Sequence, residues 1–151
     1  MPEKSEILLE TLIKQDEILC ELLDVTLKQR EALKEGRMPD LQDLMSDMRH
    51  ISVRAQAIEM KRERTAADVA SEIGCDPVVS EIIRTLAPEQ AGRMGEASRK
   101  LVSTVERLKV EMSILSRLMD EAKNLNEMLI SEWRKMSSRA AGSSGGFDTR
   151  F

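Results

Sequence analysis

The chain has 151 residues, of which 41% are hydrophobic, 33% are charged and only 2% are aromatic, and its formal net charge is −4 at pH 7. This length suits one domain of ordinary size, and the acidic balance argues against a protein whose main task is nucleic-acid binding, since that task needs a basic surface. Much of the sequence is Ala, Glu, Lys, Leu and Arg, which favours long helices, and its ten methionines suit adaptable apolar surfaces.

The first predicted element is a helix over residues 5–35. Apolar residues recur along one side of it, namely Leu8, Leu9, Leu12, Ile13, Leu19, Cys20, Leu22 and Leu23. Gln15, Asp16 and Thr26 interrupt this stripe, so the pattern is not a strict zipper.

A tight turn and a second helix follow, the helix over residues 39–73. Gly36 stands where a left-handed residue ends a helix, and Pro39 suits the first turn of the next one. The short connection predicts that the two helices are antiparallel. Alternating steps of three and four residues define a heptad seam, which weakens after Ile58 and consists of Leu41, Leu44, Met48, Ile51, Ala55, Ile58, Arg62, Thr65 and Val69.

A short connecting helix is predicted after Gly74, which ends the second helix. Asp76 is the expected N-cap, with Pro77 in the first helical position. The apolar face of this short helix consists of Val78, Val79, Ile82, Ile83 and Leu86.

The longest predicted helix covers residues 95–136, after Pro88, Gly92 and Gly95 interrupt the pattern. Its seam alternates strictly between steps of three and four and consists of Met94, Ser98, Leu101, Val105, Leu108, Met112, Leu115, Met119, Ala122, Asn126, Leu129, Trp133 and Met136. At about 1.5 Å per residue this helix exceeds roughly 60 Å, against roughly 45 to 50 Å for each of the first two. We therefore expect it to extend beyond its partners.

These elements predict an all-α fold, an elongated antiparallel three-helix bundle with coiled-coil character and a short connecting helix. No segment shows the period-two alternation of a strand. Residues 1–136 form the predicted bundle domain. Residues 137–151 are rich in Ser and Gly and are expected to form a flexible, disordered tail.

The tail carries Phe147 and Phe151, the only phenylalanines of the chain. Either the tail is inert, or these two side chains anchor a short docking peptide that folds onto a partner when it is bound.

Catalytic, cofactor and metal signals are nearly absent. The single histidine, His50, is one residue too few for a ferritin-like di-iron site, and a pair with Asp47 makes a poor metal site. Helical phosphotransfer domains also carry one exposed histidine, but the H-x-x-K-G pattern is missing here. Cys20 and Cys75 form no CxxC pair, so buried or half-buried free thiols are expected. We expect no enzyme, no cofactor and no metal.

The N-terminal segment lacks the apolar core and cleavage site of a signal peptide, and no apolar run approaches the roughly 18 residues that a membrane span needs. A cytoplasmic protein without membrane insertion is the expectation.

Several apolar residues of the longest helix fall outside its seam, namely Val102, Val110, Ile114, Leu118, Leu125, Met128 and Ile130. Those within residues 118–136 predict an exposed apolar band, which suits binding of another helix. Homodimer packing and simple core packing are the alternatives. Asn126, a polar residue in the seam, either fixes register or contacts the backbone of a bound chain.

The order of these features resembles the FlgN family of bacterial flagellar export chaperones. The segment LLETLIKQDEILCELLDVTLKQREALKEGRMPDLQDLM is similar to the opening helical hairpin of that family, and LMDEAKNLNEMLISEW resembles its N-x-x-L-x-x-S-like ending. The resemblance covers about residues 7–136, and its motifs are degenerate helical patterns rather than a catalytic signature.

The resemblance implies a cytoplasmic chaperone that binds hook–filament junction proteins, through their C-terminal helices, before type III secretion. Carried onto this chain, the client-binding residues are Leu118, Leu125, Met128, Leu129, Trp133 and Met136. Contact with export-gate components is an open expectation, because this chain has no tyrosine near its end. Either a monomer or a homodimer fits, and the alternative function is a self-associating coiled-coil or adaptor protein without a client.

Overall fold

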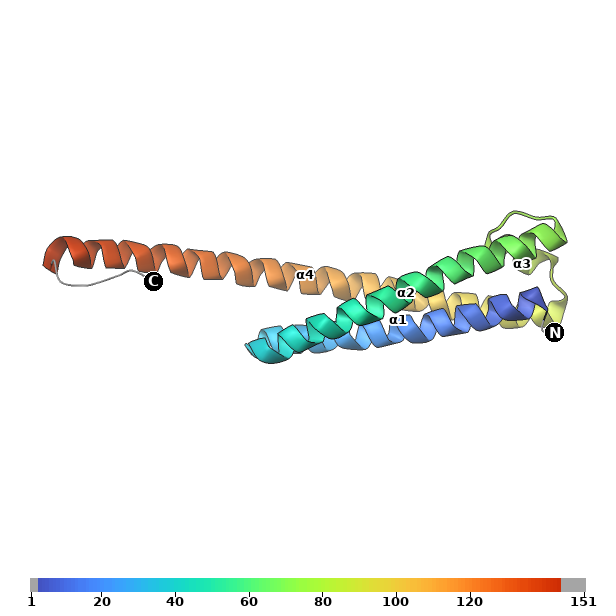
Figure 1. The fold of residues 1–151 in the computed structure, drawn as a ribbon, viewed down its shortest axis with the longest axis horizontal. Coiled ribbons are helices and arrows are strands. Elements are labelled where there is room, and N and C mark those ends of the chain that lie inside the picture. Colours follow the sequence, from blue (N-terminus) through green and yellow to red (C-terminus); the bar gives the residue numbers. More distant parts are fainter. Residues whose placement is uncertain (1–2, 145–151) are drawn as a thin grey trace. The chain divides into compact units, whose positions relative to one another are not determined.

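The computed structural model describes residues 3–144, with side chains described up to Arg139. This part of the chain contains four helices and no strand: α1 (Lys4–Lys34), α2 (Met38–Ile73), α3 (Val79–Thr85) and α4 (Pro88–Ser144), as Figure 1 shows. The predicted all-α class is confirmed. Two units divide the chain, residues 1–113 and residues 114–151, and α4 contributes to both of them.

The turn between α1 and α2 has the predicted chemistry. Gly36 has a φ of 69°, which an L-residue with a Cβ rarely adopts. Its N–H donates to the carbonyl of Leu33 at 3.3 Å, and the N–H of Arg37 donates to the carbonyl of Ala32 at 2.9 Å. These two bonds form a Schellman motif that satisfies the last carbonyls of α1. Pro39 lies in the first turn of α2, and the two helices run antiparallel side by side (Figure 1).

Gly74 ends α2 in the same way, with a φ of 81° and a hydrogen bond of 2.8 Å from its N–H to the carbonyl of Ala70. The prediction of a left-handed glycine at this position is confirmed.

The predicted start of the short helix is wrong. Val78, with φ −118° and ψ 132°, is still extended, and α3 begins only at Val79. The N–H of Val78 donates to the carbonyl of Asp76 at 2.8 Å, which closes a tight turn around Pro77. The backbone at Pro77 is therefore part of this turn and not of the first turn of α3. Asp76 therefore does not cap α3, and the capping residue, Val78, makes no side-chain hydrogen bond.

The predicted break before the longest helix is also wrong, because α4 begins at Pro88 and continues through Gly92 and Gly95. Each glycine costs a helix about 1 kcal/mol relative to alanine. Burial of Met94, which is 1% exposed between them, offsets that cost. The helix also continues past Met136 to Ser144, so residues 137–144 are helical rather than part of an irregular tail.

The core of residues 3–113 consists of two hydrophobic clusters. Each combines residues of α1, α2 and the first part of α4, and α3 adds Ile82 to the first cluster. The first contains Leu8, Leu9, Leu12, Ala66, Val69, Ala70, Ile82, Met94 and Leu101, and the second contains Ile18, Leu22, Leu23, Val25, Ile51 and Leu108. Three helices thus share the core, and the exact packing of a three-helix bundle stays a prediction.

The polar residues that interrupt the α1 stripe are buried rather than turned to solvent. Asp16, which is 5% exposed, accepts a hydrogen bond of 2.6 Å from Thr104 Oγ1 and lies 3.8 Å from Lys100 Nζ. Gln15 donates to the Glu59 carboxylate of α2. Buried polar groups need such partners, and these two tie α1 to both of its neighbours within residues 3–113.

Candidate functional site: an exposed apolar face of α4

The first part of the α4 seam is buried. Met94 is 1% exposed, Leu101 9%, Leu108 7% and Leu115 5%. The seam residues Ser98, Val105 and Met112, which alternate with these, are half-buried, and so is Met119, which follows Leu115 in the seam. The predicted seam is therefore confirmed as a burial pattern up to Met119.

The same seam is exposed beyond Met119. Leu129 is 57% exposed, Trp133 42% and Met136 61%, and Ala122 and Asn126 are exposed as well. Exposed leucine and methionine are unremarkable as single residues, but a series of them at helical spacing forms a contiguous apolar face.

Neighbouring apolar residues outside the seam widen this face. Leu125 is 52% exposed, Met128 56% and Ile130 42%, whereas Leu118 is half-buried. Leu118, Leu125 and Leu129 follow one another at steps of seven and four, and Met136 comes seven residues later, so these four share one side of the helix. Met128 lies on one edge of that side and Trp133 on the other.

The six residues of the predicted client surface therefore lie on one broad face of α4, five of them exposed and Leu118 half-buried. Their role in binding stays a prediction. Asn126 lies in the same exposed seam, and both of its proposed roles remain open. Phe147 and Phe151 lie outside the described residues.

Charges around this face are mixed in sign. Within residues 118–136, the acidic residues are Asp120, Glu121, Glu127 and Glu132, and the basic residues are Lys123, Arg134 and Lys135. Lys135 Nζ lies 3.4 Å from Glu132 Oε1, and both side chains are 61% exposed. Such exposed pairs contribute little, so apolar contact is the main attraction that this face offers.

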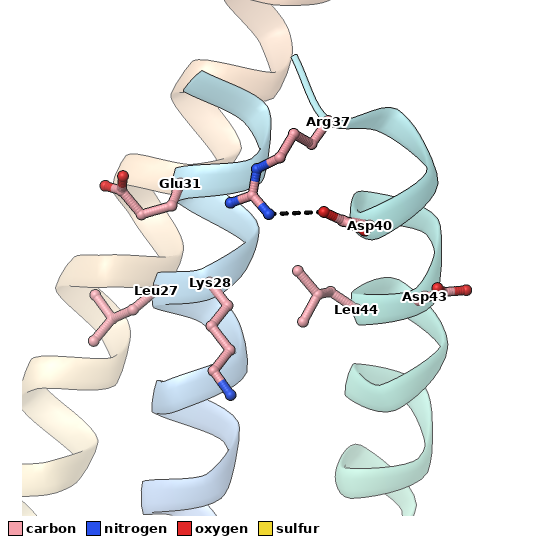
Figure 2. A pocket seen from close by; sticks show the side chains of 7 residues that line it. All are labelled: Leu27, Lys28, Glu31, Arg37, Asp40, Asp43 and Leu44. Carbon is pink, nitrogen blue, oxygen red and sulfur yellow. Dashed lines mark hydrogen bonds and ion pairs between the residues drawn. The ribbon is translucent and has the colours of Figure 1, made fainter. Parts of the chain in front are cut away.

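A pocket that was not predicted lies beside the α1–α2 turn (Figure 2). Its volume is about 440 Å³, and its lining consists of Leu27, Lys28, Glu31, Arg37, Asp40, Asp43 and Leu44. No motif marks it, because it arises from the geometry of the turn.

Arg37 lies at this pocket with its charge already balanced. Arg37 Nη1 donates to Asp40 Oδ2, and Nε donates to Glu35 Oε2, both at 2.7 Å. The hydrogen bonds that Asp40 and Glu35 accept from the Arg37 guanidinium raise its pKa above the ordinary value. Acidic groups thus surround this arginine, which makes the pocket a poor anion site.

The described residues hold little that resembles a catalytic or metal centre. No group of three or more His, Cys, Asp or Glu side chains in this part of the chain could hold a metal ion. His50 is exposed on α2, as predicted, and Cys20 and Cys75 are half-buried free thiols. Within residues 3–144, none of the helices combines the length and apolar character that crossing a membrane requires.

The family model described as FlgN protein matches residues 1–142, which is nearly the whole chain. No curated protein and no solved structure matches the chain. With an all-α fold, an opening helical hairpin and a long last helix that ends in an exposed apolar face, the chain belongs to the FlgN family.

Proposed function

We propose that this protein is a cytoplasmic flagellar export chaperone that binds hook–filament junction proteins before their type III secretion. Membership of the FlgN family supports a role in flagellar export. The observation that carries the proposal further is the exposed apolar face of α4, where Leu125, Leu129 and Met136 are each more than half exposed. A contiguous apolar surface of this kind is typical of a binding site for a partner protein.

The mechanism follows from the amphipathic character of helices. A C-terminal helix of the client lays its apolar side on residues 118–136, and the contact removes several hundred Å² of surface per partner from water, on the order of a standard interface. Met128 and Met136 have unbranched, flexible side chains, so they adapt to more than one client surface. Release requires only that a competing site take over the apolar side of the client, and no cofactor takes part in this scheme.

Residues 1–136 form the chaperone domain in this proposal, and the client surface ends at Met136. The two tail phenylalanines remain candidates for contact with an export-gate component, with an inert tail as the alternative.

A pair of matched substitutions on α4 tests the client surface. Leu129→Asp places a carboxylate at the centre of the face, where client binding would bury it without a partner. We expect its affinity for purified hook–filament junction proteins to fall by about 100-fold or more, which is the loss expected when a residue at the centre of an interface is substituted. Val110→Asp is the control, because Val110 is 58% exposed on the same helix but lies outside the seam and the face. Its affinity should stay within about twofold of wild type.

Isothermal titration calorimetry measures both affinities, and circular dichroism verifies that both variants are folded. Equal affinity of Leu129→Asp and wild type for the junction protein would contradict the assignment of the client surface to this face. Light scattering of the free protein addresses the alternative function, since a stable dimer that buries the face and binds no junction protein would favour a structural coiled coil.

A further inference from the structure

The polar contacts that α4 makes with α1 and its N-cap residue Glu3 follow a single row of α4 positions. Gln90 Nε2 donates to Glu3 Oε2 at 3.1 Å, and Arg93 Nη2 donates to Glu6 Oε1 at 3.2 Å. Further along, Thr104 Oγ1 donates to Asp16 at 2.6 Å.

The same row contains Lys100, 3.8 Å from Asp16, and Glu111, which accepts a hydrogen bond of 3.0 Å from Arg30. Ala97, between Arg93 and Lys100 in this row, packs against the first hydrophobic cluster. We call these positions, with their continuation at steps of three and four, the α1-facing row.

The spacing of the row is that of one helical face. Steps of three, four, three and four lead from Gln90 through Arg93, Ala97 and Lys100 to Thr104. The row lies directly beside the seam, so a helix that contacts it also covers seam residues, as α1 does in the cluster that joins Leu8 and Leu12 to Met94 and Leu101.

The chemistry of this row changes along α4. Between residues 90 and 111 it is mostly polar or charged, and α1 with its N-cap residue Glu3 supplies partners for five of its polar members. Continued at the same steps, the row becomes Ile114, Leu118, Glu121, Leu125, Met128, Glu132 and Lys135. Four of these seven are large and apolar, and Leu125 and Met128 are 52% and 56% exposed.

Building on the proposed chaperone function, we propose that the client helix occupies the α1-facing row of residues 118–136 and so contacts α4 at the same heptad positions that α1 contacts within residues 90–111. Its footprint includes Leu118, Leu125 and Met128 of the row together with Leu129 and Met136 of the adjacent seam. The opposite edge of the face, marked by Ile130, lies outside the footprint.

The row also defines the chemistry of the occupant. An apolar stripe must face Leu118, Leu125 and Met128, because burying these side chains is what stabilises the contact. A basic side chain of the occupant would pair with Glu121, as Arg30 of α1 pairs with Glu111, whereas Glu132 already pairs with Lys135. The partner is therefore an amphipathic helix with an apolar stripe bordered by lysine or arginine.

Three single substitutions in the full-length chain distinguish this footprint from one that covers both edges of the face, including Ile130. Leu125→Asp and Met128→Asp alter the row, and Ile130→Asp is the matched control, since Ile130 is also apolar and is 42% exposed. With a purified hook–filament junction protein as the probe, each row substitution should weaken binding at least about tenfold, whereas the Ile130→Asp affinity should stay within about twofold of wild type.

A photo-crosslinking residue placed at position 125 or at position 130 gives a second measurement. We expect crosslinks to a helix of the junction protein from position 125 and little crosslinking from position 130. Equal loss of affinity in Leu125→Asp and Ile130→Asp, or equal crosslinking from both positions, would overturn the footprint while leaving the chaperone function in place.

Crosslinks from position 125 to a second copy of the chain, in the presence of the junction protein, would overturn the assignment of the occupant. Failure of the wild-type protein to bind the junction protein would instead contradict the proposed function itself.

Discussion

The first and last parts of α4 carry the same heptad seam, yet the side chains of that seam differ sharply in exposure. Met94, Leu101 and Leu108 are at most 9% exposed, whereas Leu129 and Met136 are 57% and 61% exposed. A heptad pattern therefore indicates that a helical face is suited to burial, but it does not reveal whether the helix that covers this face belongs to the same chain. In the first part α1 and α2 share the core with α4, and in the last part we propose that a client helix takes this role.

The two parts also differ in what holds the helix together. The first part contains Gly92 and Gly95, and packing in the core offsets their low helix propensity. Residues 114–136 contain neither glycine nor proline, and strong helix formers such as Leu, Met, Glu, Lys and Arg are frequent there. A helix with an exposed apolar face depends more on propensity, since tertiary packing contributes less to it.

The largest expected effect is a difference between the two parts of α4 in how much a leucine-to-alanine substitution lowers the free energy of unfolding. Leu108→Ala removes a side chain that is 7% exposed, so it should lower the free energy of unfolding by about 2 to 4 kcal/mol. Leu129→Ala removes one that is 57% exposed, so it should change that free energy by less than about 0.5 kcal/mol. Urea denaturation followed by circular dichroism measures both. Similar losses in the two variants would mean that the face around Leu129 is already covered in the free protein.

Helix boundaries next to left-handed glycines were predictable from sequence. Gly36 and Gly74 end α1 and α2 as expected, because a Schellman-type ending needs a positive φ that glycine adopts without strain. The start of α3 was not predictable from the Asp76–Pro77 pair, because a local turn uses the backbone there. Nor did Gly92 stop α4, since tertiary packing overrides a cost of about 1 kcal/mol.

Glycine substitutions sharpen the same comparison with a smaller effect. Gly92 lies within α4 with nothing within 4 Å of an added Cβ, so Gly92→Ala should raise the free energy of unfolding by about 0.5 to 1 kcal/mol. Ala122→Gly, the reverse change in the exposed part, should lower helical content locally and leave the main urea transition unchanged. Circular dichroism at 222 nm and urea denaturation measure the two effects. A shift of the main transition by Ala122→Gly would show that this part unfolds together with the core.

The smallest expected effect is a pH dependence that arises in residues 3–113. Hydrogen bonds from Arg62, and with a smaller effect the one from Gln15, hold the pKa of Glu59 below its ordinary value of 4.5, against the opposing effect of burial. Because the pKa is lowered on folding, this carboxylate stabilises the protein above about pH 4.5 and loses that contribution as the pH falls through its folded pKa.

Glu59→Gln keeps the shape of the side chain and removes the titration. Its loss of stability relative to wild type should be largest near pH 7 and should shrink below pH 4.5, as measured by urea midpoints at several pH values. A difference that does not vary with pH would contradict the role of the Glu59–Arg62 pair.

The candidate face was predictable in part. Its apolar residues were visible as members of the seam and its neighbours, because helical spacing alone places Leu125 and Leu129 on one side. The exposure of that face could be inferred only from helix lengths. The buried pairing of Asp16 with Thr104 was not predictable, because the two residues are 88 positions apart and each appears in the sequence as an ordinary polar interruption. The pocket beside Arg37 had no sequence signal.

Hydrogen exchange of backbone amides, compared between the free protein and its complex with a purified junction protein, tests the central claim most directly. We predict rapid exchange within residues 120–136 of the free protein, strong protection of these residues in the complex, and little change within residues 94–112, whose seam is already buried. Slow exchange of residues 120–136 in the free protein, or protection that appears only outside them on binding, would contradict the assignment of this face as the client site.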